Sequence, residues 1–178
     1  MRKLPGDMSE QQDVARIIRV DHAGEYGAMR IYAGQLAVMG KTPGRALVEH
    51  MAEQEKRHLE TFEKLMSERK VRPTVLMPLW HMAGFALGAA TALMGEKAAF
   101  ACTAAIESVI DGHYAEQQKR LGVNEETLAR TIEKFRAEEI EHHDTSLAQG
   151  AEETPLYPVF SGAIKAASKL AIWLSTRV

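Results

Sequence analysis

The chain has 178 residues, enough for one domain and too few for two of ordinary size. Its 22 basic and 24 acidic residues give a net charge of −2, which argues against a nucleic-acid-binding protein. The single cysteine, Cys102, excludes a disulfide framework or a CxxC metal motif. The short, polar beginning of the chain resembles no secretory leader. We therefore expect an intracellular protein with one domain over residues 1–178, of which 1–8 form a flexible N-terminus.

The first half of the chain carries the start signals of two helices. Ser9 and Gln12 have the spacing of a capping box, which predicts a helix that continues to about Met39. After a glycine-containing turn, Thr42 is the expected N-cap and Pro43 the expected first residue of a second helix. That helix should end near residue 70, before the break at residues 72–74.

Residues 73–95 form a run of 23 residues without a formal charge. The run is long enough to cross a bilayer. It contains two prolines, His81 and several small residues, however, so we favour a buried or membrane-dipping helix over a membrane span.

The second half of the chain predicts three more helices, over residues 96–121, from an N-cap at Asn124 to about Gln149, and over 156–176. The last helix is amphipathic, and it either faces the core or lies on a membrane surface. Its expected apolar side consists of Leu156, Val159, Phe160, Ile164, Ala167, Leu170, Ala171 and Leu174.

Two Glu-x-x-His motifs lie on separate predicted helices, and this spacing places both side chains of a motif on one helix face. The helix before each motif carries one glutamate in a largely apolar stretch, 30 residues upstream in the first half and 32 in the second. The two halves therefore resemble copies of one helical hairpin. The six residues are Glu25, Glu55, His58, Glu107, Glu139 and His142.

Two such hairpins predict an all-α, ferritin-like four-helix bundle with an apolar crossover helix and an extra C-terminal amphipathic helix. Four carboxylates and two imidazoles in its core would balance two divalent ions and leave coordination positions open for O₂. Without metal, the buried carboxylates would repel one another. The alternative interpretation is that Glu25 and Glu107 are ordinary helix-surface or interface residues.

Other polar residues are secondary candidates. Asp111, one helical turn past the fourth-helix glutamate, is either a partner for the ring N–H of a ligating histidine or a solvated charge. Asp21 precedes Glu25 by the same interval, and a solvated charge is the simpler explanation there. Tyr114 is a candidate hydrogen-bond partner or electron carrier near the metals, or else a core residue with a satisfied hydroxyl. Its neighbour His113 is an outer partner or a surface residue. The glycines on either side of Glu25 suggest close approach of another helix or of a substrate.

Three segments, 18–28, 72–80 and 138–144, closely resemble the demethoxyubiquinone hydroxylase family, and the likeness extends over about 14–177. The resemblance implies a non-haem di-iron monooxygenase of ubiquinone biosynthesis, with two iron ions per chain held by the six residues above. It implies hydroxylation of a polyprenylated methoxy-methyl-benzoquinone with O₂ and electrons from NADH. The family's His-Tyr pair matches His113 and Tyr114.

The resemblance also implies a peripheral protein on the cytoplasmic face of a bacterial inner membrane, or on the mitochondrial matrix face for a eukaryotic chain without its presequence. It implies a lipid-binding partner from the same pathway. An exposed apolar face could contact that partner, a second copy of the chain or the bilayer. Because no glycine-rich dinucleotide motif follows a strand, the use of NADH rests on the family alone. Two alternatives are a ferroxidase or peroxidase of the ferritin or rubrerythrin type, and a non-catalytic helical scaffold at a membrane surface.

Overall fold

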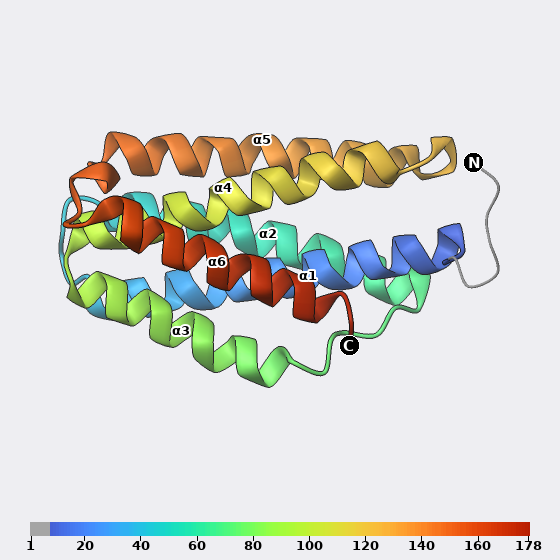
Figure 1. Ribbon diagram of the computed structural model, residues 1–178, viewed down its shortest axis with the longest axis horizontal. Helices are drawn as coiled ribbons and strands as arrows, with labels where there is room; N and C mark the ends of the chain where they lie inside the picture. The colour runs from blue at the N-terminus through green and yellow to red at the C-terminus, as the bar shows by residue number, and fades with distance from the viewer. Residues whose placement is uncertain (1–7) are drawn as a thin grey trace.

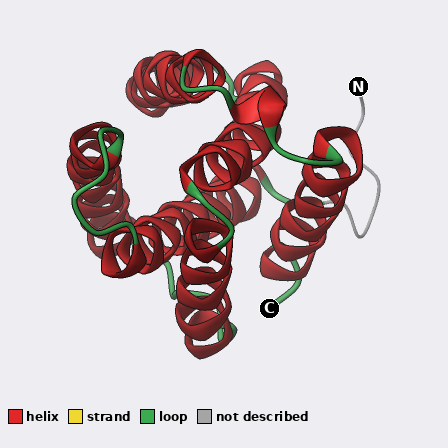
Figure 2. Ribbon diagram, turned by 90° about the vertical axis from the view of Figure 1, so that its left-hand side faces the viewer, coloured by secondary structure: helices red, strands yellow, loops and turns green. Residues whose placement is uncertain are grey.

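The computed structural model describes residues 8–178, which form α-helices joined by short loops and two 3-10 turns, with no strand in this range (Figures 1 and 2). The all-α prediction is confirmed, whereas the predicted flexible segment lies, apart from Met8, outside the described residues. The helices are α1 (Glu10–Val38), α2 (Arg45–Arg69), α3 (Met77–Leu93), α4 (Glu96–Arg120), α5 (Glu126–Ala148) and α6 (Tyr157–Ser175).

The bundle consists of two antiparallel hairpins, α1 with α2 and α4 with α5 (Figure 1). Apolar side chains fill the bundle on both sides of a polar layer. Met51 belongs to one apolar cluster and Phe62 to a second, and the first Glu-x-x-His motif lies between these two residues on α2. The fold therefore holds this motif inside the protein, between two packed apolar regions.

Helix α3 connects the hairpins and packs directly against the backbone of α1 (Figure 1). A Cβ atom at Gly84 would lie 2.9 Å from the carbonyl oxygen of Gly27, and one at Gly88 would overlap the carbonyl group of Ile31. Glycine is required at these positions because a side chain would force the helices apart. The apolar run is helical only over the 17 residues of α3, and no helix among residues 8–178 has both the length and the hydropathy of a membrane span.

The predicted capping box at Ser9 is present, but two other helix starts differ from the predictions. Helix α2 is preceded by Gly44, because Thr42 forms a turn in which its carbonyl accepts from the backbone N–H of Arg45. Asn124 lies inside a 3-10 turn, and α5 therefore begins one residue later than expected, with Glu125 as its N-cap.

Helix α6 does not have the single apolar side that its sequence predicts. Ile164 is buried against the bundle, whereas Val159, Leu170 and Trp173 are exposed. A helix turns about 100° per residue, so Val159 and Leu170 share one face while Ile164 points about 120–140° away from them. Both interpretations of this helix hold in part, because one side packs on the bundle and another presents apolar side chains outward.

Candidate metal centre

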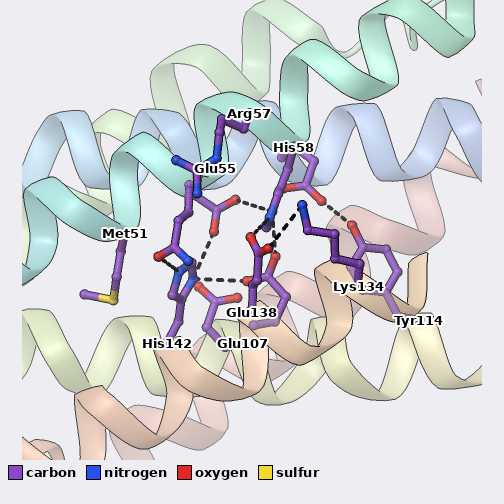
Figure 3. Close-up of polar contacts among 12 residues, drawn as sticks. Met51, Glu55, Arg57, His58, Glu107, Tyr114, Lys134, Glu138 and His142 are labelled. Atoms are coloured by element: carbon purple, nitrogen blue, oxygen red, sulfur yellow. Dashed lines mark hydrogen bonds and ion pairs between the residues drawn. The ribbon is translucent and has the colours of Figure 1, made fainter. Parts of the chain in front are cut away.

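The six residues of the repeated pattern lie together in the middle of the bundle, and each is at most 3% exposed. Figure 3 labels four of them, Glu55, His58, Glu107 and His142. Helices α1, α2, α4 and α5 all contribute. They form two groups in which the candidate ligand atoms lie within 4.8 Å of one another: Glu25, Glu55, His58 and Glu139 in the first, and Glu55, Glu107, Glu139 and His142 in the second. Glu55 and Glu139 belong to both groups, and this is the placement that bridging carboxylates require.

The Nδ1 atom of each histidine faces the carboxylates. In His58 this atom lies 3.1 Å from Glu139 and 3.5 Å from Glu25. In His142 it lies 3.2 Å from both Glu55 and Glu139. Each imidazole therefore presents one nitrogen to the shared carboxylates from its own end of the cluster.

Several buried polar atoms of this cluster have no hydrogen-bond partner: one oxygen of Glu55, both oxygens of Glu139, and Nδ1 of His58 and of His142. Unpaired buried polar atoms are expensive, about 1–3 kcal/mol each and more when charged. Carboxylate oxygens and imidazole nitrogens are common ligands of iron and manganese, and four carboxylates neutralise two divalent cations. The donor set thus fits two such ions, which would satisfy these atoms.

Crowding of the carboxylates shows in their pKa values. Burial, followed by repulsion from neighbouring carboxylates, raises the pKa of Glu55 and Glu107 well above the usual range. Burial also raises the pKa of Glu139. Glu25 is the exception: burial opposes its ionisation, but His58, Glu55 and Tyr114 together lower its pKa. The cluster disfavours its own negative charge, as expected of a site that binds cations.

The pKa values of the two histidines are shifted in opposite directions. Burial opposes the charged form of His58, but Glu139 and Glu25 outweigh it and raise its pKa to about 10. Burial lowers the pKa of His142.

The outer nitrogen of each histidine has a partner that sequence reasoning missed. Nε2 of His58 lies 2.8 Å from Oε2 of Glu138 (Figure 3). Nε2 of His142 lies 3.0 Å from Oε1 of Gln54. Each partner directly precedes the glutamate of a Glu-x-x-His motif and contacts the histidine of the other motif. That shared position was the available signal. Such partners fix the orientation and tautomer of a ligating imidazole.

Two buried tyrosines hydrogen-bond to the glutamates that are not shared. The hydroxyl of Tyr114 donates to Glu25, and that of Tyr32 donates to Glu107 at 3.1 Å. Only Tyr114 was a candidate from the sequence, although Tyr32 follows Glu25 by the same seven residues that separate Tyr114 from Glu107. Both hydroxyls act across the hairpins, because each contacts the glutamate of the opposite half.

The two aspartates lie in different surroundings. Asp111 accepts a hydrogen bond at 2.6 Å from Nε of Arg136 and is partly exposed, so it fits the surface-charge interpretation and not the contact with a ligating histidine. Asp21, expected to be a solvated charge, is buried and accepts from Gln117 at 2.5 Å. His113 lies 3.4 Å from Asp21 and is partly buried at the edge of the centre.

An apolar cleft of about 790 Å³, counting its mouth, lies between α1, α3, α4 and α6. Its lining includes Gly24 and Gly27 of α1, Trp80 of α3, Ile106 and Ile110 of α4 and Ala171 of α6. A Cβ atom at Gly27 would have no neighbour within 4 Å, so this glycine widens the cleft and does not serve helix packing. Gly24 and Ile106 directly precede Glu25 and Glu107, which places the inner wall of the cleft beside the cluster.

An antiparallel bundle with four carboxylates and two Glu-x-x-His histidines in its core defines the ferritin-like dimetal-carboxylate class. Within this class, residues 12–175 match the family model described as Ubiquinone biosynthesis protein COQ7, and the chain belongs to that family.

Curated relatives agree with this assignment. A Rhodospirillum rubrum protein named 3-demethoxyubiquinol 3-hydroxylase is 58% identical over 99% of this chain and 84% of its own length. A human mitochondrial protein named NADPH-dependent 3-demethoxyubiquinone 3-hydroxylase is 53% identical over 93% of this chain and 78% of its own. A Saccharomyces cerevisiae mitochondrial protein named 5-demethoxyubiquinone hydroxylase is 41% identical over 92% and 77%. The human name specifies NADPH, whereas the expectation from the sequence was NADH.

Proposed function

We propose that this chain is a di-iron monooxygenase that hydroxylates a ring C–H position of a polyprenylated demethoxybenzoquinone in ubiquinone biosynthesis. One oxygen atom of O₂ enters the ring and the other leaves as water. The two electrons and one proton come from a reduced nicotinamide nucleotide, and a second proton comes from solvent. NADH is the donor expected from the sequence, and the names of several relatives favour NADPH.

The observation that carries the proposal is the pair of ligand groups that share Glu55 and Glu139 beside an apolar cleft. Two iron ions held there by the six residues would supply the activation of O₂ that a quinone C–H bond requires. The protein then has to bind the ring, orient it and exclude water.

The cleft is suited to these tasks. Its walls are almost wholly apolar, and the missing side chain at Gly27 leaves room for a flat ring next to Glu25. The indole N–H of Trp80 donates to the hydroxyl of Ser175 at 3.1 Å, which ties α3 to α6 at the cleft. An apolar pocket with few polar groups is typical of sites that bind hydrophobic ligands.

A substrate whose prenyl tail is dissolved in a membrane would account for the apolar outer surface of α3 and α6. Helices α3 and α6 flank the cleft and expose large apolar side chains, among them Leu79, Met82, Leu170 and Trp173. We propose that this face rests on a membrane in which the prenyl tail is dissolved. The membrane would be a bacterial inner membrane at its cytoplasmic face, or the mitochondrial inner membrane at its matrix face. A lipid-binding pathway protein, or a second copy of the chain, would use the same apolar face.

The test is a single-turnover reaction. Metal-free protein is loaded anaerobically with Fe²⁺, reduced, mixed with a short-tailed demethoxyquinone and exposed to ¹⁸O₂, once with NADH and once with NADPH as reductant. We expect two iron ions per chain and a product that contains one ¹⁸O atom in a new ring hydroxyl, measured by mass spectrometry. Two irons with only water or peroxide as product would favour a ferroxidase or peroxidase. No bound iron in a fully helical protein would leave the scaffold interpretation.

A further inference from the structure

The inner ligands alone do not distinguish the two metal positions. Each group contains three carboxylates and one histidine, and two of the carboxylates, Glu55 and Glu139, are common to both. The remaining glutamates, Glu25 and Glu107, each accept a hydrogen bond from one tyrosine hydroxyl. Any chemical difference between the positions must therefore arise from groups outside the ligand set.

The outer partners of the two histidines provide such a difference. Glu138 and Gln54 occupy equivalent positions in the two motifs and make contacts of similar length, 2.8 Å to His58 and 3.0 Å to His142. The geometry is conserved between the halves, but one partner is a carboxylate and the other a neutral amide. The charge of this one side chain breaks the symmetry of the centre.

The orientation of each imidazole ring determines how its outer partner affects a bound metal. In both rings Nδ1 faces the carboxylates and Nε2 faces the outer partner. A metal on Nδ1 leaves Nε2 protonated, so both outer partners act as acceptors. An anionic acceptor draws the proton more strongly than an amide does, and this makes the imidazole a better electron donor to the metal.

The surroundings of each partner suit its charge. The Glu138 side chain is 19% exposed, and Nζ of Lys134 lies 3.6 Å from its other oxygen, so solvent and a cation support its negative charge. Gln54 is only 7% exposed, where a further carboxylate beside Glu55 would be poorly solvated.

We propose that Glu138 and Gln54 are positioning residues that make the two metal positions unequal, so that the ion beside His58 is held more tightly than the ion beside His142. This inference rests on the proposed two-metal centre and extends it to the order of loading. At limiting metal, the position formed by Glu25, Glu55, His58 and Glu139 fills first.

The test is anaerobic titration of metal-free protein with Fe²⁺, and in parallel with Co²⁺, against a competing chelator. We expect two equivalents whose dissociation constants differ by about tenfold or more. Glu138→Gln should weaken the tighter one by about 10- to 100-fold, the usual effect of losing an outer partner of a ligating histidine. Glu133→Gln removes an exposed charge from the same helix and should change neither dissociation constant.

A pair of ligand variants identifies the positions and keeps both outer partners in place. Glu107→Ala should retain the tighter equivalent, whereas Glu25→Ala should retain only the weaker one. The inference is overturned if the wild-type chain binds two equal ions, if natively helical Glu138→Gln retains the tighter affinity, or if Glu25→Ala does. None of these results would affect the hydroxylase proposal, which the ¹⁸O₂ reaction tests separately. A wild-type chain that binds no metal would overturn both.

Discussion

The hydroxyl of Tyr32 donates a hydrogen bond to Glu107, 75 positions later in the chain and on the opposite hairpin. Tyr114 makes the reciprocal contact with Glu25. Each of the unshared glutamates is thus oriented by the half of the protein to which it does not belong, so docking of the two hairpins also sets the geometry of the ligands.

Replacing either tyrosine should therefore destabilise the metal-loaded protein without releasing its metal ions. Hydrogen bonds to charged groups contribute about 1.5–3 kcal/mol, so Tyr32→Phe should lower the free energy of unfolding of the metal-loaded protein by about that amount. Urea unfolding monitored by circular dichroism measures the change. Tyr157→Phe is the matched control, because this partly buried ring packs against the same apolar cluster that contains Tyr32. Equal stability of the two variants would contradict the role of the Tyr32 hydroxyl.

Removing a shared ligand should have a larger effect than removing an unshared one. Glu139 belongs to both ligand groups, so Glu139→Ala should lose both metal ions and at least about 100-fold in hydroxylation rate. His142→Ala should also lose metal and activity. Metal content is measured after desalting, and activity is measured as product formation. Glu141→Gln, an exposed change nearby on the same helix, should keep both ions. Full activity of Glu139→Ala would exclude this cluster as the active centre.

The metal-free protein should become less stable as the pH rises. Three of the four carboxyl groups have raised pKa values in the folded state, chiefly through burial, so the stability they contribute is complete below about pH 4.5 and is lost above it. His58, with a pKa of about 10, loses its contribution between about pH 6.5 and 10. Glu25 and His142 have lowered pKa values and act in the opposite direction.

Because the raised groups outnumber the lowered ones, we expect the melting temperature of chelator-treated protein to fall by several degrees between pH 5.5 and 8.5. Metal binding favours ionised carboxylates and neutral imidazoles, so the loaded protein should show the reverse trend over part of this range. Thermal melts of both forms in matched buffers make the comparison. A melting temperature of the metal-free form that rises with pH would contradict the crowded-carboxylate description.

A charge on the outer face of α6 should weaken membrane binding and spare the centre. Leu170 is 55% exposed and makes no contribution to the three buried clusters, so Leu170→Glu should reduce sedimentation with liposomes severalfold while two iron ions remain bound. Val123→Glu places the same charge on another exposed residue, outside α3 and α6, and should bind liposomes like the wild type. Unchanged sedimentation of Leu170→Glu would exclude this face as the membrane contact.

The contact between α1 and α3 should not tolerate a methyl group. In Gly88→Ala the new Cβ would overlap the backbone of Ile31, and overpacking of this kind typically costs about 1–3 kcal/mol. Gly112→Ala on α4 meets no atom within 4 Å and should be neutral or stabilising by up to about 1 kcal/mol. Chemical unfolding distinguishes them, and a Gly88→Ala variant as stable as Gly112→Ala would disprove the close backbone approach.

Helical spacing and the internal repeat were enough to predict the all-helical bundle and to place all six ligand candidates in one buried cluster. Both signals are local: the Glu-x-x-His spacing fixes a helix face, and the repeat shows that two hairpins present the same face. The cross-bundle pairs are Gln54 with His142 and Glu138 with His58. They depend on the axial offset between the two hairpins, which no local pattern encodes.

The same limit explains the two aspartates. Asp21 lies one helical turn before Glu25 and Asp111 one turn after Glu107, yet the one expected to be solvated is buried beside Gln117 while the other pairs with Arg136 at the surface. The difference lies in the residues that face them from another helix. The 3-10 turn before α5 was missed for a related reason, since such turns have weak sequence signals.

Neither hairpin contains a complete ligand group. The first group takes one carboxylate, Glu139, from the second hairpin, and the second group takes Glu55 from the first. A bound pair of ions would therefore act as a cross-link between distant parts of the chain, in the way a disulfide does, and would close loops far longer than any turn in the fold. An isolated half of the sequence should then fail as a metal-binding peptide, however helical it is, and two separately expressed halves should associate more strongly when metal is supplied.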